Sequence, residues 1–298
     1  MDSTSNILTS DPVVQRGLPM AYRIEPLSPL GARVEVTDPD ALLASPTAPG
    51  ELLHALEIHG GVLVFPRLGL DAPTQLAFAR RMGDVVVKTS AGWSRAHPGV
   101  YRVALDPAAN DEFFVKGSWD WHIDGATSLG IPPKASLLAC RTKPSAGGDT
   151  QFVDTYAAYD RLTAEEKRRF ESLKVWHRIE LDAYSTPMNL SPESLARLES
   201  EPAHLHPLIW THRDGRKSLV IGVTATQVEG LPKAEGRALL RSLVDRATEP
   251  RYVLNHVWSV GDLVIWDNRG TMHRARPFEA DSGRDMYRVM LEGDEPIQ

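Results

Sequence analysis

Two histidines and one aspartate have the residue types and spacing of a metal site. His122 and Asp124 lie two residues apart, and His273 follows much later in the chain. In an extended segment, side chains at positions i and i+2 point to the same side about 6.6 Å apart, so both could contact one ion. Two histidines and one carboxylate are the ligand set that holds Fe(II) on one face and leaves the other face open for reagents. These three residues are therefore the candidate metal ligands.

Two arginines near the C-terminus, Arg284 and Arg288, suggest a co-substrate. An iron oxygenase of this class needs an electron-rich co-substrate, usually 2-oxoglutarate, which chelates iron at one end and carries a second carboxylate at the other. Arginine suits that carboxylate because its planar guanidinium forms two parallel charge-assisted hydrogen bonds. Taken alone, the two arginines would be interpreted as surface charges on a late strand, and only the ordered set of motifs favours the co-substrate.

Five motifs in order carry a family resemblance. They are Trp121–Asp124, Gly147–Phe152, Gly261–Arg269, Met272–Ala275 and the closing pair of Arg284 and Arg288. With them the chain resembles the taurine dioxygenase/2,4-dichlorophenoxyacetate dioxygenase (TauD/TfdA-like) family of Fe(II)- and 2-oxoglutarate-dependent oxygenases, over roughly residues 22–293.

The resemblance implies a role for each matching residue. The implied Fe(II) ligands are His122, Asp124 and His273, and the implied holders of the far carboxylate of 2-oxoglutarate are Thr150 and Arg284. Arg288 matches the second arginine of the family, which commonly faces an anionic group of the primary substrate. The implied reaction consumes O2 and 2-oxoglutarate, hydroxylates an unactivated C–H bond, and releases succinate and CO2.

The substrate-binding positions depart from the taurine pattern. Residues 84–93 lack the histidine and tyrosine typical of taurine enzymes, and Gly117–Trp121 replaces an Asn-rich run. A pocket wall with Trp93, Trp119 and either Phe113 or Phe114 favours a small anionic substrate with an aromatic or bulky apolar body, because rings contribute large buried area. The alternative is that these rings only pack the core.

Rival functions remain open at this point. The same cofactors could act on a secondary-metabolite intermediate, by hydroxylation, desaturation or epoxidation, with Arg288 serving structure only. A zinc hydrolase could use the same three ligands to activate water, but Arg284 would then have no assigned partner. A barrel that has lost catalysis and only binds ligands is the third alternative. Metal content and dependence on 2-oxoglutarate distinguish the iron oxygenase, the zinc hydrolase and the barrel that only binds ligands.

Composition and charge limit the partners. The 298-residue chain has a net charge of −6, which argues against a nucleic-acid partner and leaves a small-molecule substrate. One cysteine, Cys140, excludes an internal disulfide and suits a reducing, cytoplasmic compartment. The N-terminus lacks a signal peptide, and no run approaches the roughly 20 apolar residues that span a bilayer. A homo-oligomer is compatible with all of this.

The pattern of apolar and turn residues predicts a mainly β protein with flanking helices. Helices are expected over 51–59, 73–82, 163–173 and 232–248. Strands are expected near 62–65, 100–105, 134–141, 150–153, 173–180, 206–212, 218–223, 251–258, 262–266, 271–278 and 285–292. Many short strands separated by glycine, proline and Asx turns are typical of a jelly roll or barrel. The family resemblance implies a double-stranded β-helix (jelly roll, cupin-like) with helices outside one sheet.

The expected domain organisation is simple. Residues 1–20 are expected to form a loosely ordered tail, and residues 21–298 a single oxygenase domain. Within it, residues 181–203 are rich in proline, serine, asparagine and glutamate and are expected to form a long loop. A loop of that length inside a compact domain often serves as a lid, so this one could cover the pocket.

Overall fold

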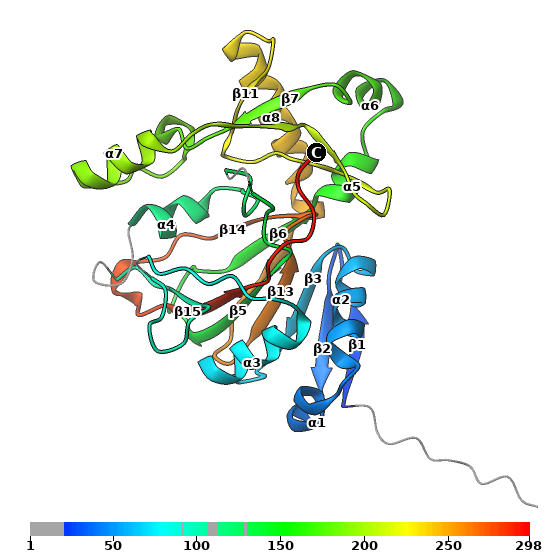
Figure 1. Cartoon of the computed structure of the whole chain (residues 1–298), viewed down its shortest axis with the longest axis vertical. Helices are drawn as coiled ribbons and strands as arrows, with labels where there is room; N and C mark the ends of the chain where they lie inside the picture. Colours follow the sequence, from blue (N-terminus) through cyan, green and yellow to red (C-terminus); the bar gives the residue numbers. More distant parts are fainter. Residues whose placement is uncertain (1–20, 91, 107–111, 128–129) are drawn as a thin grey trace, which may run out of the picture.

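The computed structural model describes residues 21–90, 92–106, 112–127 and 130–298. The predicted N-terminal tail over residues 1–20 lies outside the described residues. The described part of the chain is built around a large sheet, with helices on one side of it and a smaller sheet on the other (Figure 1). The single domain over residues 21–298 stays a prediction.

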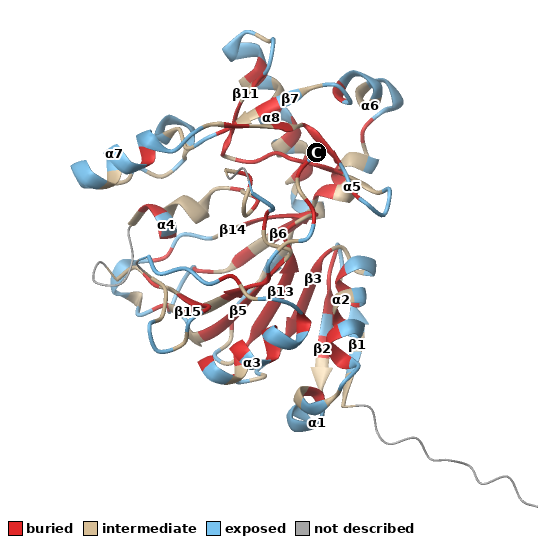
Figure 2. Cartoon of the chain, viewed as in Figure 1, coloured by how far each residue is buried: buried red, intermediate tan, exposed pale blue. Residues whose placement is uncertain are grey.

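The larger sheet has seven strands, antiparallel except for one parallel pair between its second and third strands. In spatial order they are β1 (Tyr22–Pro26), β2 (Ala32–Val36), β3 (Val62–Phe65), β13 (Leu263–Asp267), β5 (Ala135–Thr142), β15 (Asp285–Met290) and β4 (Val100–Val103). The strands that lie side by side come from distant parts of the sequence, as in β5 between β13 and β15. Much of this sheet is buried (Figure 2).

The smaller sheet brings together three strands that include two predicted site positions. It consists of β12 (Leu254–His256), β6 (Thr150–Asp154) and β14 (Thr271–Ala275). Phe152 of β6 packs on Trp266 of β13, with ring centroids 5.6 Å apart, so the inner faces of the two sheets share one apolar core. Two sheets packed face to face form the predicted jelly roll.

Alternation along the central strands explains how one sheet has two apolar faces. Leu137 and Ala139 of β5 join the cluster under the helices, whereas Leu138 and Cys140 join the core between the sheets. Successive side chains of a strand point to opposite faces, so a strand covered on both sides is apolar throughout. The helices on the outer face are α1 (Pro39–Ala44), α2 (Ala48–Ile58) and α3 (Ala72–Met82).

The chain between β6 and β12 forms a further layer over one end of the sheets (Figure 1). Its elements are α5 (Thr155–Asp160), α6 (Ala164–Phe170), β7 (Lys174–His177), α7 (Pro192–Ser200), β8 (His204–Pro207), β9 (Ile209–Thr211), β10 (Lys217–Leu219), β11 (Ala225–Val228) and α8 (Lys233–Ala247). They enclose a second apolar cluster around Val175, Leu208 and Leu243.

Two predictions for this layer are wrong in detail. The single strand expected over 206–212 is two strands, because β8 pairs with β7 while β9 pairs with β10, and the partner changes at Leu208. The long loop expected over 181–203 contains a 3-10 turn, η2 (Leu181–Ala183), and helix α7. That helix begins with Ser191, whose side chain caps it, and Pro192 at its first position. Both are recognised helix-start residues that the polar composition of the segment had obscured.

Several elements were not predicted from the sequence. They are β1, β2, β11, α1, α5, α7 and α4 (Glu112–Lys116) with the adjoining turn η1 (Gly117–Trp119). The strand expected over 251–258 begins instead with the turn η3 (Pro250–Tyr252), and another short turn, η4 (Ala280–Ser282), precedes β15. Among the described residues, no helix combines the length and apolar character needed to cross a membrane. The cytoplasmic location stays a prediction.

A capping box starts α6, the helix expected from residue 163. The hydroxyl of Thr163 accepts a hydrogen bond from the Glu166 amide at 3.1 Å, and the Glu166 carboxylate accepts one from the Thr163 amide at 2.8 Å. We expect Thr163→Ala to lower the free energy of unfolding by about 1 kcal/mol, because an amide at the helix start loses its acceptor. Urea denaturation measures this, with Thr163→Ser as the control that keeps the acceptor. An unchanged unfolding midpoint for the alanine variant would contradict the assignment.

Candidate active site

The two predicted histidine ligands face each other across a short antiparallel bridge. His273 lies on β14, and the segment that contains His122 runs beside it. The His122 amide donates to the His273 carbonyl at 3.0 Å, and the reverse bond is 2.9 Å long. Paired residues of adjacent strands project to the same side, so the two rings lie together with centroids 4.3 Å apart.

Asp124 completes a compact group of three metal-ligating side chains. Its carboxylate oxygens lie 3.9 Å from Nε2 of His122 and 3.8 Å from Nε2 of His273. The candidate ligand atoms of the three residues all lie within 4.8 Å of one another. The extended geometry assumed from the sequence does not extend to Asp124, because the chain already turns there and Gly125 follows with φ of 90°. The donor set is nevertheless the one that a facial Fe(II) site requires.

Hydrogen bonds orient the ligands from outside. Nδ1 of His122 lies 2.8 Å from the Asp120 carbonyl, so the ring donates there and leaves Nε2 free to coordinate. Ser136 donates to Asp124 at 3.3 Å and itself accepts a bond from the Asn268 side chain at 3.0 Å. Such supporting contacts hold a ligand in one orientation before the metal binds.

The surroundings set protonation states that suit metal binding. Burial acts to raise the pKa of Asp124, but the Arg288 guanidinium and the two imidazoles outweigh it and lower the pKa to about 2. Burial, followed by the neighbouring His122, lowers the pKa of His273 to about 3. At neutral pH the aspartate is therefore a carboxylate and His273 is neutral, which are the forms that bind metal.

One cavity contains both histidines and the three cationic or hydroxyl positions predicted from the resemblance. Its lining consists of Tyr101, Val103, Phe114, Ser118, His122, Leu138, Thr150, Trp266, His273, Ala275, Arg284 and Arg288. The structure thus brings Thr150, Arg284 and Arg288 to the same cavity as the metal group. Tyr101 and Ser118 were not predicted. Tyr101 lies opposite Arg288 on the neighbouring strand, and no local sequence pattern predicts that pairing.

Arg284 is a buried cation with unused hydrogen-bond donors. The residue is 4% exposed, and its Nε and Nη1 are buried without a hydrogen-bond partner in the described part of the chain. Burial lowers the pKa of Arg284 to about 10, so it stays charged at neutral pH. A buried charge without a counter-ion is unfavourable, and this position therefore suits an anion that enters the cavity. The far carboxylate of 2-oxoglutarate has that chemistry.

Thr150 fits the same role. Its hydroxyl oxygen accepts a hydrogen bond from Trp258 Nε1 at 3.0 Å. The hydroxyl hydrogen remains available, because the indole only donates. Gly148 leaves the room that this arrangement needs, since a Cβ there would lie 3.1 Å from the Cδ and Nε atoms of Arg284. Gly148 also has φ of 72°, a conformation that glycine adopts without strain.

The two tryptophans predicted for the substrate wall do not line this cavity. Trp93 lines a different cavity, together with Arg95 and His97, and meets the metal-site cavity only through an edge contact with Tyr101 at 5.5 Å. Trp119 packs on Phe278 with centroids 5.8 Å apart. Of the two phenylalanines, Phe114 lines the metal-site cavity, whereas Phe113 is buried against Tyr184.

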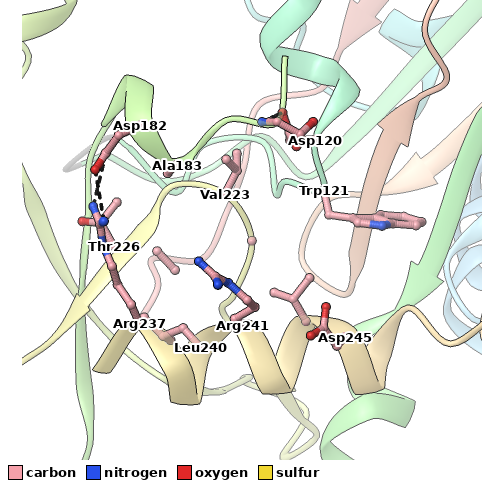
Figure 3. A pocket seen from close by; sticks show the side chains of 14 residues that line it. Asp120, Trp121, Asp182, Ala183, Val223, Thr226, Arg237, Leu240, Arg241 and Asp245 are labelled. Atoms are coloured by element: carbon pink, nitrogen blue, oxygen red, sulfur yellow. Dashed lines mark hydrogen bonds and ion pairs between the residues drawn. The ribbon is translucent and has the colours of Figure 1, made fainter. Parts of the chain in front are cut away.

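A separate cavity of about 400 Å³ lies behind the metal-binding segment, under α8. Figure 3 shows Asp120 and Trp121 on one side of it and Arg237 of α8 bonded to Asp182 on the other. None of the three candidate ligands lines it. Its walls connect to the metal group, because the segment at Asp120 continues to His122 and accepts a hydrogen bond from the Ser185 amide of the segment at Asp182.

The remaining buried histidines have structural partners. His177 contacts the Thr224 hydroxyl at 3.1 Å, and His206 contacts the Ala126 carbonyl at 3.1 Å. His212 lies 2.8 Å from the Ser218 hydroxyl and 3.3 Å from the Glu295 carboxylate. That trio has the residue types of a hydrolytic triad, but all three are buried and none lines a described cavity. The contacts of His212 with Glu295 and Ser218 join the C-terminal segment to β9 and β10.

Comparison with known proteins decides the family. The chain matches the family described as "Taurine catabolism dioxygenase TauD, TfdA family" over residues 23–290. The chain belongs to this family. It is a 2-oxoglutarate-dependent non-haem iron dioxygenase, an enzyme class that uses Fe(II), 2-oxoglutarate and O2. The zinc-hydrolase alternative has no support from these findings.

Relatives and a solved structure cover nearly the whole dioxygenase. It is 35% identical over 249 residues to the (S)-phenoxypropionate/alpha-ketoglutarate-dioxygenase of Sphingobium herbicidovorans, across 81% of this chain and 85% of that one. It is 35% identical over 283 residues to the alpha-ketoglutarate-dependent 2,4-dichlorophenoxyacetate dioxygenase of Cupriavidus pinatubonensis, across 91% and 97%. The crystal structure of AAD-2 in complex with Mn(II) and N-oxalylglycine matches with a TM-score of 0.75 at 31% identity, across 93% and 99%. The predicted jelly-roll fold is thereby confirmed.

Proposed function

We propose that this dioxygenase hydroxylates a C–H bond of a small anionic substrate with a bulky apolar body, and that aryloxyalkanoic acids are its first substrate class. The observation that carries the proposal is Arg288. Its guanidinium lines the cavity, with Nη1 3.4 Å from Asp124 Oδ2, and its buried Nε has no partner among the described residues. An anion held there lies beside the metal group. The phenoxypropionate and dichlorophenoxyacetate enzymes among the relatives favour the aryloxy class.

Each cavity residue then has a separate task. His122, Asp124 and His273 hold Fe(II), and Arg284 with Thr150 binds the far carboxylate of 2-oxoglutarate. When bound, Fe(II), 2-oxoglutarate and O2 supply the oxidation of the C–H bond, with release of succinate and CO2. The protein orients the substrate and keeps water from the reacting atoms, to which the apolar wall of Leu138, Trp266 and Val103 contributes.

The bond that is hydroxylated decides the product. In a 2-aryloxyalkanoate such as phenoxyacetate, the carbon beside the ether oxygen is also the carbon beside the carboxylate. A carboxylate bound by Arg288, next to the metal group, brings that carbon toward the reacting centre. Hydroxylation there forms a hemiacetal, which collapses to a phenol and an oxo acid. The expected products are therefore succinate, CO2, a phenol and an oxo acid in equal amounts.

A substrate panel tests the proposal. Fe(II) and then 2-oxoglutarate are added anaerobically to the metal-free protein, and the visible charge-transfer band of the chelate is recorded. Phenoxyacetate, 2-phenoxypropionate, taurine, an alkyl sulfate and an apolar lactone are then compared for the shift of that band and for succinate release in air. Phenol released in step with succinate supports the aryloxy class. Turnover of the lactone alone would instead support the secondary-metabolite alternative, which stays a prediction, as does a homo-oligomeric state.

Arg288→Ala is expected to raise the KM for the primary substrate by at least about 30-fold, because a buried charged hydrogen-bond partner is lost. The KM for 2-oxoglutarate should change much less, since Arg284 remains. Steady-state succinate formation measures both values. Arg23→Ala, at an exposed position of β1, is the matched control. Equal effects on the two KM values would refute the separate tasks of the two arginines.

A further inference from the structure

Phe114 is an exposed ring at the metal-site cavity. It lines that cavity and is 53% exposed, whereas its neighbour Phe113 is buried. Consecutive residues of a helix point about 100° apart, so α4 directs one ring inward and the next toward the cavity mouth. A large apolar side chain exposed at a binding cavity is the kind of surface that a ligand covers.

Helix α7 holds this ring from outside. The Arg197 guanidinium of α7 lies over the Phe114 ring, 5.3 Å from its centroid. A cation on one face of a ring is a favourable contact, and it leaves the ring edge and the opposite face for another partner. Phe113 makes an edge contact with Tyr184 at 5.5 Å, so the two neighbouring rings of α4 both contact the segment over residues 181–203.

The beginning of that segment is anchored beside the metal group. Asp182 pairs with Arg237 of α8 at 3.1 Å (Figure 3), and the Ser185 amide donates to the Asp120 carboxylate at 3.1 Å. Asp120 is also the residue whose carbonyl orients His122. By contrast, α7 buries only Leu198 and lies at the edge of the molecule (Figure 1). An element with so few buried side chains opens at small cost.

We propose that Phe114 contacts the apolar body of the substrate and that Arg197 of α7 positions its ring. This inference deepens the proposed function and rests on it. Arg288 and Phe114 line the same cavity, so the carboxylate end and the ring end of an aryloxyalkanoate each have a partner. Aromatic rings prefer edge-to-face or offset contacts at 4.5–7 Å, which supplies the aryl preference.

Phe114 variants test the ring contact. Phe114→Ala should raise the KM for phenoxyacetate by about tenfold, but that for heptanoate by less than about threefold, with kcat nearly unchanged. Phe114→Leu keeps an apolar surface without a ring, so it should lose the preference for phenoxyacetate over heptanoate. Phe114→Tyr keeps a ring and should therefore retain the wild-type preference for phenoxyacetate. The KM for 2-oxoglutarate should stay at the wild-type value in all three variants.

A double-mutant cycle tests the role of α7. Arg197→Gln should raise the KM for phenoxyacetate by about threefold in the wild-type background and have no effect once Phe114 is alanine, because the two residues act as one unit. Glu199→Ala, at an exposed position of the same helix, is the control that should change nothing. Additive effects of Arg197→Gln and Phe114→Ala would overturn the positioning role of Arg197.

The outcomes separate this inference from the proposed function. If wild-type enzyme oxidises phenoxyacetate but Phe114→Ala leaves its KM unchanged, or raises the phenoxyacetate and heptanoate values equally, the inference fails and the proposed function stands. If no aryloxy acid is oxidised, the proposed substrate class fails. The best substrate of the panel is then used, and an unchanged KM in Phe114→Ala overturns the inference as well.

Discussion

His122→Ala is expected to abolish turnover and to weaken Fe(II) binding by at least about 100-fold. Loss of a residue that only hydrogen-bonds to a metal ligand already weakens metal binding by up to about 100-fold, and loss of a ligand should weaken it more. The reason is geometric. His122 supplies one of three candidate ligand atoms that lie within 4.8 Å of one another, and the described residues contain no other such group of His, Cys, Asp or Glu. The bridge between the His122 and His273 backbones does not depend on the imidazole, so the fold should survive.

Anaerobic titration with Fe(II) and 2-oxoglutarate measures this effect through the charge-transfer band and through bound iron. His54→Ala is the matched control, because its side chain is 70% exposed and far from the cavity lining in sequence. Retention of iron and of succinate formation by His122→Ala would refute the metal assignment, whatever the substrate proves to be.

Arg284→Met is expected to raise the KM for 2-oxoglutarate by at least about 30-fold. Without the guanidinium, the far carboxylate would be buried without its charged partner. Arg284→Lys should give an intermediate value, since an ammonium keeps the charge but cannot form two parallel hydrogen bonds. Initial rates at varied 2-oxoglutarate measure both, with Arg288→Ala as the comparison.

The same substitution separates binding from structure. In the ligand-free protein Arg284 is a buried cation whose Nε and Nη1 lack partners among the described residues. Replacing such a charge by an apolar side chain of similar length often leaves stability unchanged or raises it. We therefore expect the melting temperature of metal-free Arg284→Met to equal or exceed that of wild type while 2-oxoglutarate binding is weakened. A large fall in melting temperature would indicate that Arg284 serves the fold instead.

Much of the fold was predictable because it depends on local patterns. The strand expected near 134–141 is β5, and the helix expected from residue 163 is α6. Helix α7 was missed because the polar composition of residues 181–203 indicated a loop. In the structure, Ser191 caps a helix that begins there despite that composition. β8 and β9 were merged because they follow each other with one residue between them, and the change of pairing partner depends on distant segments.

The sequence by itself determined the chemistry of this protein. Ligation of Fe(II) and binding of 2-oxoglutarate need particular residue types, and the residues proposed for these roles occur in order as His122, Asp124, Thr150, His273 and Arg284. Only the tertiary structure decided which rings face the cavity. The expected rings were Trp93, Trp119 and either Phe113 or Phe114. Of these four, Phe114 alone lines the cavity, together with Tyr101. The physical reason is that the lining is set by pairing between distant strands, such as Arg288 opposite Tyr101, and by the direction in which a helix turns each side chain. Neither is encoded in the neighbourhood of any single residue.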